Sequence, residues 1–183
     1  LPHPLLEKRR FVLEPLSEIA PNLQHPVSGL TVKEMLKALN RGTVAVLEEA
    51  TPDELSAINR LLPQLSSSAK ALSAEALEAL IASPHTYIYI IKDENGLTQG
   101  MASLCLCASP TGTKSWVEDV VVDKDCRGRG YARALLQHLK QESRRLGAKS
   151  LNLTSRPERQ AANALYSSEG FSLRSTNVYR LSE

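Results

Sequence analysis

The chain has 183 residues, a formal net charge of +2 and a hydrophobic content of 42%. This length suits one domain of ordinary size, and so small a charge gives no reason to expect nucleic acid binding. No apolar run approaches the roughly 20 residues that span a bilayer, so we expect no membrane partner. The three cysteines form no paired framework or metal-ligand cluster, which favours a reducing, cytoplasmic location and no bound metal.

Residues 1–40 differ from the rest because they hold half of the ten prolines and show little periodicity before Thr31. Prolines at that density disfavour long helices and central strands. Apolar side chains at helical spacing over 31–39 predict one short helix, which ends near Asn40-Arg41-Gly42. We therefore expect an N-terminal extension over 1–40.

From Thr43 the pattern predicts a strand, two helices and a hairpin. The strand covers 43–49, and Thr51 and Glu54 form a capping box for the first helix, with Pro52 at its first position. A second helix is expected over 73–82. Strands over 87–92 and 97–107 are joined by a turn in which Asn95-Gly96 supplies positive φ.

The region 114–146 combines a β-branched strand, a loop rich in glycine and arginine, and an amphipathic helix over 130–146. Unpaired N–H groups at a helix start carry the positive end of its dipole, and Gly128 and Gly130 leave room for close approach. The pattern predicts a phosphate cradle, although a plain strand-to-helix turn fits the local sequence as well. A strand over 150–154, a helix capped by Ser155 and Glu158, and a hairpin over 171–175 and 178–181 complete the chain.

The cradle does not match the common nucleotide-binding glycine motifs, but Arg127 to Ala132 matches R/Q-x-x-G-x-G/A. It resembles the acetyl-CoA signature of the GNAT superfamily of N-acetyltransferases. A second segment, from Asn163 through Tyr166 to Gly170-Phe171, is similar to the shorter form of N-x-x-x-x-Y-x-x-x-G-F in the same superfamily. By itself, Tyr166 is typical of an ordinary amphipathic helix. The resemblance therefore depends on finding both motifs in this order along the chain.

The resemblance covers about 140 residues and implies an α/β (α+β) GNAT fold over 41–183. Its expected central sheet is mixed, with about seven strands in the order β-α-α-β-β-β-α-β-α-β-β and helices on both faces. It also implies that the strand before the cradle and the next parallel strand splay apart to admit pantetheine. The implied acetyl-CoA contacts are Val120, Val121, Val122, Arg127, Gly128, Arg129, Gly130, Tyr131, Ala132, Arg133, Asn163 and Tyr166.

The resemblance also implies how the acetyl group moves. Tyr166 matches the tyrosine that often protonates the departing thiolate, and Glu118 is our choice of general base, acting through water. Strand alternation places Glu118 on the face of Val120 and Val122, with Asp119 on the other face. A structural role for Glu118 remains the alternative. We expect direct transfer, because Cys126 is poorly placed to carry the acetyl group.

The N-terminal extension has a separate resemblance. Residues 1 to about 40, above all Leu1 to Pro26, resemble the C-terminal end of hydroxymethyldihydropterin pyrophosphokinase, whose residues matching His3 and Arg9 contact ATP phosphates. That family's paired metal-binding aspartates, pterin pocket and most of its sheet are missing here, so the extension should not be catalytic alone.

These observations predict an acetyl-CoA-dependent N-acetyltransferase that acts on a primary amine of a small molecule or a protein. Two alternatives stay open: the C-terminal part of a bifunctional folate-pathway pyrophosphokinase/acetyltransferase fusion, and a non-catalytic acetyl-CoA-binding module. We expect acetyl-CoA and an amine acceptor as partners, no nucleic acid, and a monomer or homodimer.

Overall fold

The computed structural model describes residues 3, 6–39 and 42–181, and the chain divides into two compact units, Leu1–Leu153 and Thr154–Glu183. No helix in the described part of the chain is long and apolar enough to cross a membrane.

The N-terminal segment of the first unit has its own small core. It consists of η1 Leu6–Lys8, α1 Arg10–Ile19 and α2 Val32–Leu39. Leu13, Val32 and Met35, which are at most 1% exposed, form that core. The expected helix α2 is confirmed. Thr31 and Glu34 cap it reciprocally, since the Thr31 N–H donates to Glu34 Oε2 (2.8 Å) and the Glu34 N–H donates to Thr31 Oγ1 (3.2 Å).

Helix α1 was not predicted from the sequence, because the prolines of this segment disfavour long helices. Pro15 lies inside α1 and removes one backbone N–H from its ladder. The helix nevertheless forms, because Leu13 is fully buried and Leu16 packs against the same core. Tertiary burial therefore outweighs the local cost of the proline.

The central sheet of the first unit has five strands in chain order, from β1 to β5. They are β1 Thr43–Val46, β2 Thr86–Lys92, β3 Thr98–Cys107, β4 Lys114–Val122 and β5 Leu151–Leu153. Neighbours are antiparallel except β4 and β5, which are parallel. The β2–β3 turn forms as expected, with Gly96 at φ 79° and the Asp93 N–H donating to the Leu97 carbonyl (2.9 Å).

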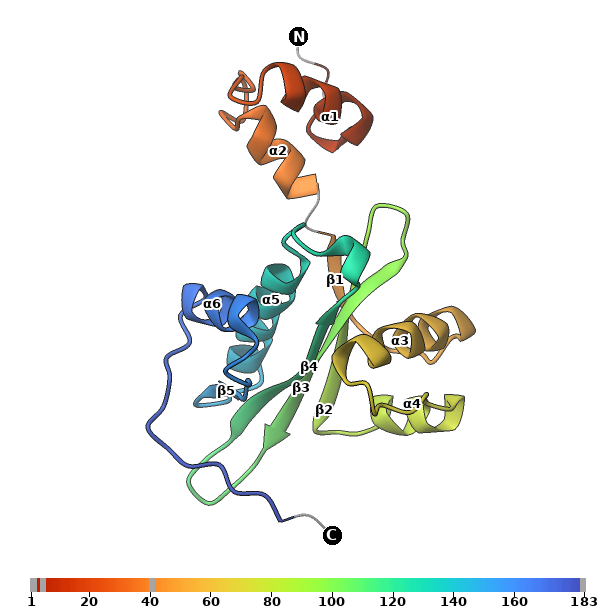
Figure 1. Cartoon of the computed structure of the whole chain (residues 1–183), viewed down its shortest axis with the longest axis vertical. Helices are drawn as coiled ribbons and strands as arrows, with labels where there is room; N and C mark the ends of the chain where they lie inside the picture. The colour runs from red at the N-terminus through yellow and green to blue at the C-terminus, as the bar shows by residue number, and fades with distance from the viewer. Residues whose placement is uncertain (1–2, 4–5, 40–41, 182–183) are drawn as a thin grey trace. The chain divides into compact units, whose positions relative to one another are not determined.

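Three helices cover the two faces of this sheet (Figure 1). α3 Pro52–Leu65 and α4 Ala74–Ile81 lie on one face, and Thr51 caps α3 by accepting the Glu54 N–H (3.3 Å). The core beneath them consists of Leu47, Ile58, Leu61, Leu77, Ile88, Ile90, Met101 and Val121. α5 Tyr131–Arg145 lies on the other face, where the Tyr89 hydroxyl donates to Glu142 (3.2 Å) and Ser115 bonds to Ser143 (2.7 Å).

The second unit consists of α6 Gln160–Ser168 and an extended tail. Two expectations are wrong here. The helix begins after Arg159 without a side-chain cap, so Ser155 and Glu158 do not cap it. Described residues 171–181 form no strand, which leaves five strands instead of about seven. The local sequence of these residues specifies no hydrogen-bonding partner, and a strand requires one.

Candidate active site

Strand β4 contains a β-bulge next to the residues expected to bind acetyl-CoA. Glu118 pairs with Ser103 of β3, and the next pair is Val121 with Met101, so two β4 residues face one β3 residue between these pairs. Asp119 lies in the bulge at φ 54°, a left-handed conformation that aspartate tolerates better than most residues. The extra residue reverses the alternation of side chains beyond it.

The bulge corrects the expected facing of Glu118. The β3 partners of Glu118 and Val121 lie two residues apart on one face, so Glu118 and Val121 share that face. Val121 and Met101 belong to the core beneath α3 and α4. Glu118 therefore lies on the α3/α4 side, and Val120 and Val122 lie on the other side. Strict alternation fails because it assumes an unbroken ladder.

The carboxyl group of Glu118 is electrostatically perturbed. Partial burial, followed by the negative charge of Asp119, raises its pKa. Both effects disfavour the ionised form, and a raised pKa brings a carboxylate closer to the range of a useful general base. Val121, by contrast, is only 4% exposed, so its side chain serves packing and its backbone alone can meet a ligand.

Strand β5 is paired with β4 over its whole length, but β4 continues beyond it. The parallel ladder runs from Ser115 with Leu151 to Val117 with Leu153, whereas β4 continues to Val122. β4 thus extends past the end of β5 before the cradle. The β4 backbone from 118 to 122 has no β5 partner, and amide groups of a bound arm can satisfy such a strand edge.

The cradle follows β4 through the short helix η2 Lys124–Cys126. Gly128 and Gly130 have φ of 79° and 84°, and α5 begins directly after Gly130. A Cβ built on either glycine meets no atom within 4 Å, so the space beside both backbones is open. Open glycine backbone at a helix start is the arrangement that binds phosphate oxygens, so the residues present fit a pyrophosphate group.

The remaining cradle residues divide into a charged rim and a packed base. Arg127 and Arg133 are exposed, and Arg129 is half-buried. Tyr131 is 1% exposed and anchors the first turn of α5 in the fold, with Ala132 next to it. Tyr131 thus contributes its backbone to the cradle, and its ring packs in the interior.

The second motif forms a defined helix end within the second unit. The Gly170 N–H donates to the Ser167 carbonyl (3.1 Å), and the Phe171 N–H donates to the Tyr166 carbonyl (3.0 Å), with Gly170 at φ 88°. This is a Schellman cap, and the Tyr166 and Phe171 rings meet edge to face at 6.1 Å. The Gly-Phe pair therefore ends α6 and also orients the tyrosine ring.

Two side chains of this unit, Tyr166 and Asn163, have different surroundings. Burial raises the pKa of the Tyr166 phenol, although the charge of Arg159 lowers it in part. The phenol therefore stays protonated at neutral pH. The Asn163 amide donates to the carbonyls of Arg156 (3.0 Å) and Pro157 (3.4 Å), so it holds the loop before α6 in place.

Sequence reasoning missed a set of contacts between α3 and the entrance of the cradle. Arg60 forms an ion pair with Asp123, and Gln64 contacts both Asp123 and the Lys124 N–H. Arg60 and Gln64 are four residues apart and share a helix face. No local pattern links them to Asp123, because about 60 residues of chain separate the partners.

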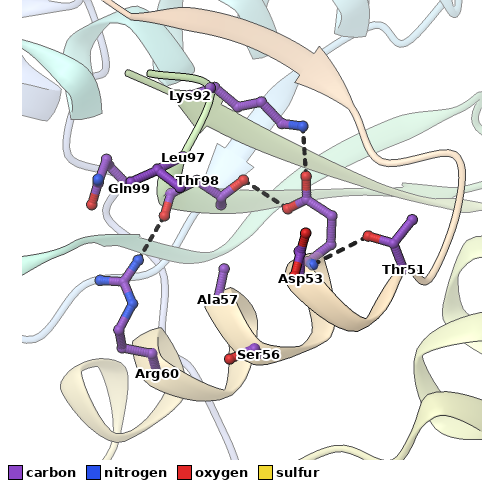
Figure 2. Close-up of a pocket in the computed structure, with 11 residues that line it drawn as sticks. Thr51, Asp53, Ser56, Ala57, Arg60, Lys92, Leu97, Thr98 and Gln99 are labelled. Atoms are coloured by element: carbon purple, nitrogen blue, oxygen red, sulfur yellow. Dashed lines mark hydrogen bonds and ion pairs between the residues drawn. The ribbon is translucent and has the colours of Figure 1, made fainter. Parts of the chain in front are cut away.

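A cavity of about 560 Å³ lies between the start of α3 and the β2–β3 hairpin (Figure 2). Glu54 is partnered there, since Lys92 Nζ lies 2.6 Å from it and the Thr98 hydroxyl donates to it (2.7 Å). Arg60 also lines it and donates to the Thr98 carbonyl (2.7 Å). None of the site residues expected from the sequence lines this cavity.

The same fold occurs in solved acetyltransferases. A Trypanosoma brucei acetyltransferase is 27% identical, with a TM-score of 0.64 over 77% of this chain and 99% of that one. AAC(6')-Iy, solved with the bisubstrate analog CoA-S-monomethyl-acetylneamine, is 16% identical, with a TM-score of 0.63 over 77% and 97% of the two chains.

A folic acid synthesis protein, FOL1 of Dictyostelium discoideum, is 50% identical over 42 residues. These make up 23% of this chain and only 6% of that protein, in accord with the resemblance of the N-terminal extension.

The model of the acetyltransferase (GNAT) family matches residues 48–171. That range contains strands β2 to β5, the bulge in β4, the glycine cradle and both sequence motifs. The chain belongs to the GNAT acetyltransferase family.

Proposed function

We propose that this protein is an acetyl-CoA-dependent N-acetyltransferase that acts on a primary amine. The observation that carries the proposal is the continuous path from the unpaired end of β4 to the open glycine cradle at the start of α5. A strand edge that can bond amides, followed by a phosphate-binding helix start, suits the pantetheine and pyrophosphate parts of coenzyme A.

Different groups of the chain bind different parts of acetyl-CoA. Backbone groups of Val120, Val121 and Val122 hold the pantetheine amides. The pyrophosphate rests on backbone N–H groups of the cradle, with Arg127, Arg129 and Arg133 adding positive charge. Asn163 and Tyr166 belong to the second unit and complete the set we propose. Bound acetyl-CoA supplies an acetyl group activated as a thioester.

For the chemical step, Glu118 accepts the proton of the incoming ammonium, through water, so that the amine becomes nucleophilic. The raised pKa of Glu118 supports this role, and its place on the α3/α4 side of the sheet supports an acceptor that approaches from there. Tyr166 holds the proton that the departing thiolate needs, and burial keeps its phenol protonated. Neither role requires a covalent acetyl-enzyme.

The acceptor is a small-molecule amine or a protein amino group. The structural neighbour solved with an acetylated-neamine bisubstrate analog supports including aminoglycosides among the first candidates. The negative charges of Glu118 and Asp119 beside the unpaired strand end favour a cationic acceptor.

Release of free CoA thiol, followed against panels of aminoglycosides, polyamines, amino acids and peptides, tests the proposal. Calorimetric titration with acetyl-CoA accompanies it. We expect micromolar-range binding and at least one acceptor that depends on Tyr166. Binding without turnover of any amine would instead identify a non-catalytic acetyl-CoA-binding module. Failure to bind acetyl-CoA would refute the proposal.

A second candidate is favoured by the FOL1 similarity: residues 1–40 are a pyrophosphokinase-like extension, and residues 41–183 are the acetyltransferase domain of a longer fused polypeptide. Sequencing of the complete transcript tests it. A D-x-D strand upstream in the same reading frame would support the fusion, and a start codon immediately before Leu1 would exclude it.

A further inference from the structure

The contacts between α3 and the loop after β4 have a consequence for donor binding. We propose that Arg60 and Gln64 are positioning residues, which hold Asp123 and thereby the entrance of the acetyl-CoA cradle. This inference rests on the proposed function. We call the three side chains of Arg60, Gln64 and Asp123 the α3 latch.

The latch fixes the loop through both its backbone and its side chains. Gln64 Oε1 accepts the Lys124 N–H (2.8 Å), and Gln64 Nε2 lies 3.4 Å from Asp123 Oδ2. Asp123 Oδ1 accepts the Asp125 N–H (3.0 Å), which caps η2. The path that leads from β4 to Gly128 is therefore held by α3 as well as by its own strand.

Arg60 connects this loop to the neighbouring strand. It pairs with Asp123 and also donates from Nη2 to the Thr98 carbonyl (2.7 Å), as Figure 2 shows for the second contact. The Asp123 N–H donates to the Gln99 carbonyl (2.8 Å), so β3 and the loop are joined at two adjacent points. Movement of the cradle entrance would break several of these bonds together.

Charge gives the latch a second role. Asp123 is 5% exposed, and its carboxylate lies four residues before Arg127, where the cradle begins. An unpaired buried carboxylate there would repel a pyrophosphate group and would itself lack solvation. Arg60 offsets that negative charge, so its loss should weaken binding of the anionic part of the donor in particular.

If Arg60 and Gln64 only stabilised the fold, the expected result would be different. Their loss would then lower activity equally with every donor, because a loosened fold harms the whole site. Acetyl-CoA and S-acetylpantetheine separate the two cases, since S-acetylpantetheine carries the same thioester and pantetheine arm without the pyrophosphate and adenosine. If the α3 latch instead positions the cradle, its loss should weaken the binding of acetyl-CoA but not the use of S-acetylpantetheine.

The experiment compares Arg60→Met, Arg60→Lys, Gln64→Met and Arg60→Met/Asp123→Asn in the full chain. Arg144→Met is the matched control, because Arg144 is an exposed arginine in the last turn of α5. Calorimetry gives the Kd for acetyl-CoA, and kinetics give kcat/KM for both donors. Hydrogen exchange over residues 123–131 reports the order of the loop directly.

For Arg60→Met we expect the Kd for acetyl-CoA to rise at least tenfold, with less than a threefold change in kcat/KM for S-acetylpantetheine. Asp123→Asn in that background should recover much of the affinity, because asparagine still caps η2 and removes the charge. Arg60→Lys should lie between the wild type and Arg60→Met. Faster exchange over 123–131 should accompany the loss in Arg60→Met and Gln64→Met.

An unchanged Kd for acetyl-CoA in a folded Arg60→Met, or equal losses with both donors, would overturn the inference. If Arg60→Met does not fold, the same comparison is made with Arg60→Lys and the double variant. A wild-type protein that binds no acetyl-CoA would instead refute the proposed function. The two failures are therefore distinct.

Discussion

Replacing Gly130 by alanine should weaken donor binding far more than it weakens the fold. Gly130 has φ 84°, and a Cβ there meets no protein atom within 4 Å. The left-handed conformation costs an alanine about 1–2 kcal/mol, and the lower entropy of the unfolded chain returns about 0.4–1 kcal/mol. A net loss of about 1 kcal/mol corresponds to a fall in Tm of roughly 2–4 °C for a chain of this size.

Binding should respond much more strongly, because the added methyl group occupies the open side of the backbone where we place the pyrophosphate. We expect the Kd for acetyl-CoA, measured by calorimetry, to rise at least tenfold. Gly147→Ala is the matched control: Gly147 has φ 74°, has equally open surroundings, and follows the other end of α5. It should lose similar stability and keep its affinity within twofold.

If Gly130→Ala and Gly147→Ala lose equal stability and both bind acetyl-CoA as the wild type does, the reasoning fails. Glycine would then be required at 130 for its backbone conformation alone, and the cradle would lie elsewhere.

Three further predictions concern the proposed chemistry. Tyr166→Phe should lower kcat more than tenfold with little change in the KM for acetyl-CoA; a kcat within threefold of wild type would remove Tyr166 as the acid. Phe171→Ala should also lower kcat, because the Tyr166 ring loses its edge-to-face partner, while Phe171→Leu should restore part of it. Glu118 acts when ionised, so activity should fall as pH drops through its raised pKa, and the acidic limb should lie above the ordinary glutamate value of about 4.3. Asp119→Asn removes a negative charge that opposes the ionisation of Glu118, so the acidic limb should move to lower pH. If the limb does not move, Glu118 is not the group that controls it.

Local features of the fold followed closely from the sequence. The Thr51 cap and the turn at Gly96 form as their motifs predict, and the backbone beside Gly128 and Gly130 is open, as expected. Each depends on the conformational preferences of a few consecutive residues. The order of elements from β1 to α6 was predictable for the same reason, because periodicity reports local burial.

Features that depend on distant partners did not follow from the sequence. Alternation placed Glu118 with Val120, but the ladder with β3 holds a bulge and turns Glu118 toward α3 and α4. Helix α1 forms around Pro15 because Leu13 finds a buried environment against α2. The same limit applies to described residues 171–181, which were expected to form a hairpin but have no ladder partner.

The family, the glycine-rich loop before α5 and the end of α6 were therefore predictable from the sequence, since short contiguous motifs specify them. Three features emerge only in the folded chain: the face that Glu118 occupies, the end of the β4–β5 ladder at Val117 and Leu153, and the contacts of α3 with Asp123 through Arg60 and Gln64. The physical reason is that strand register and long-range ion pairs are settled by partners tens of residues away, which no local pattern encodes.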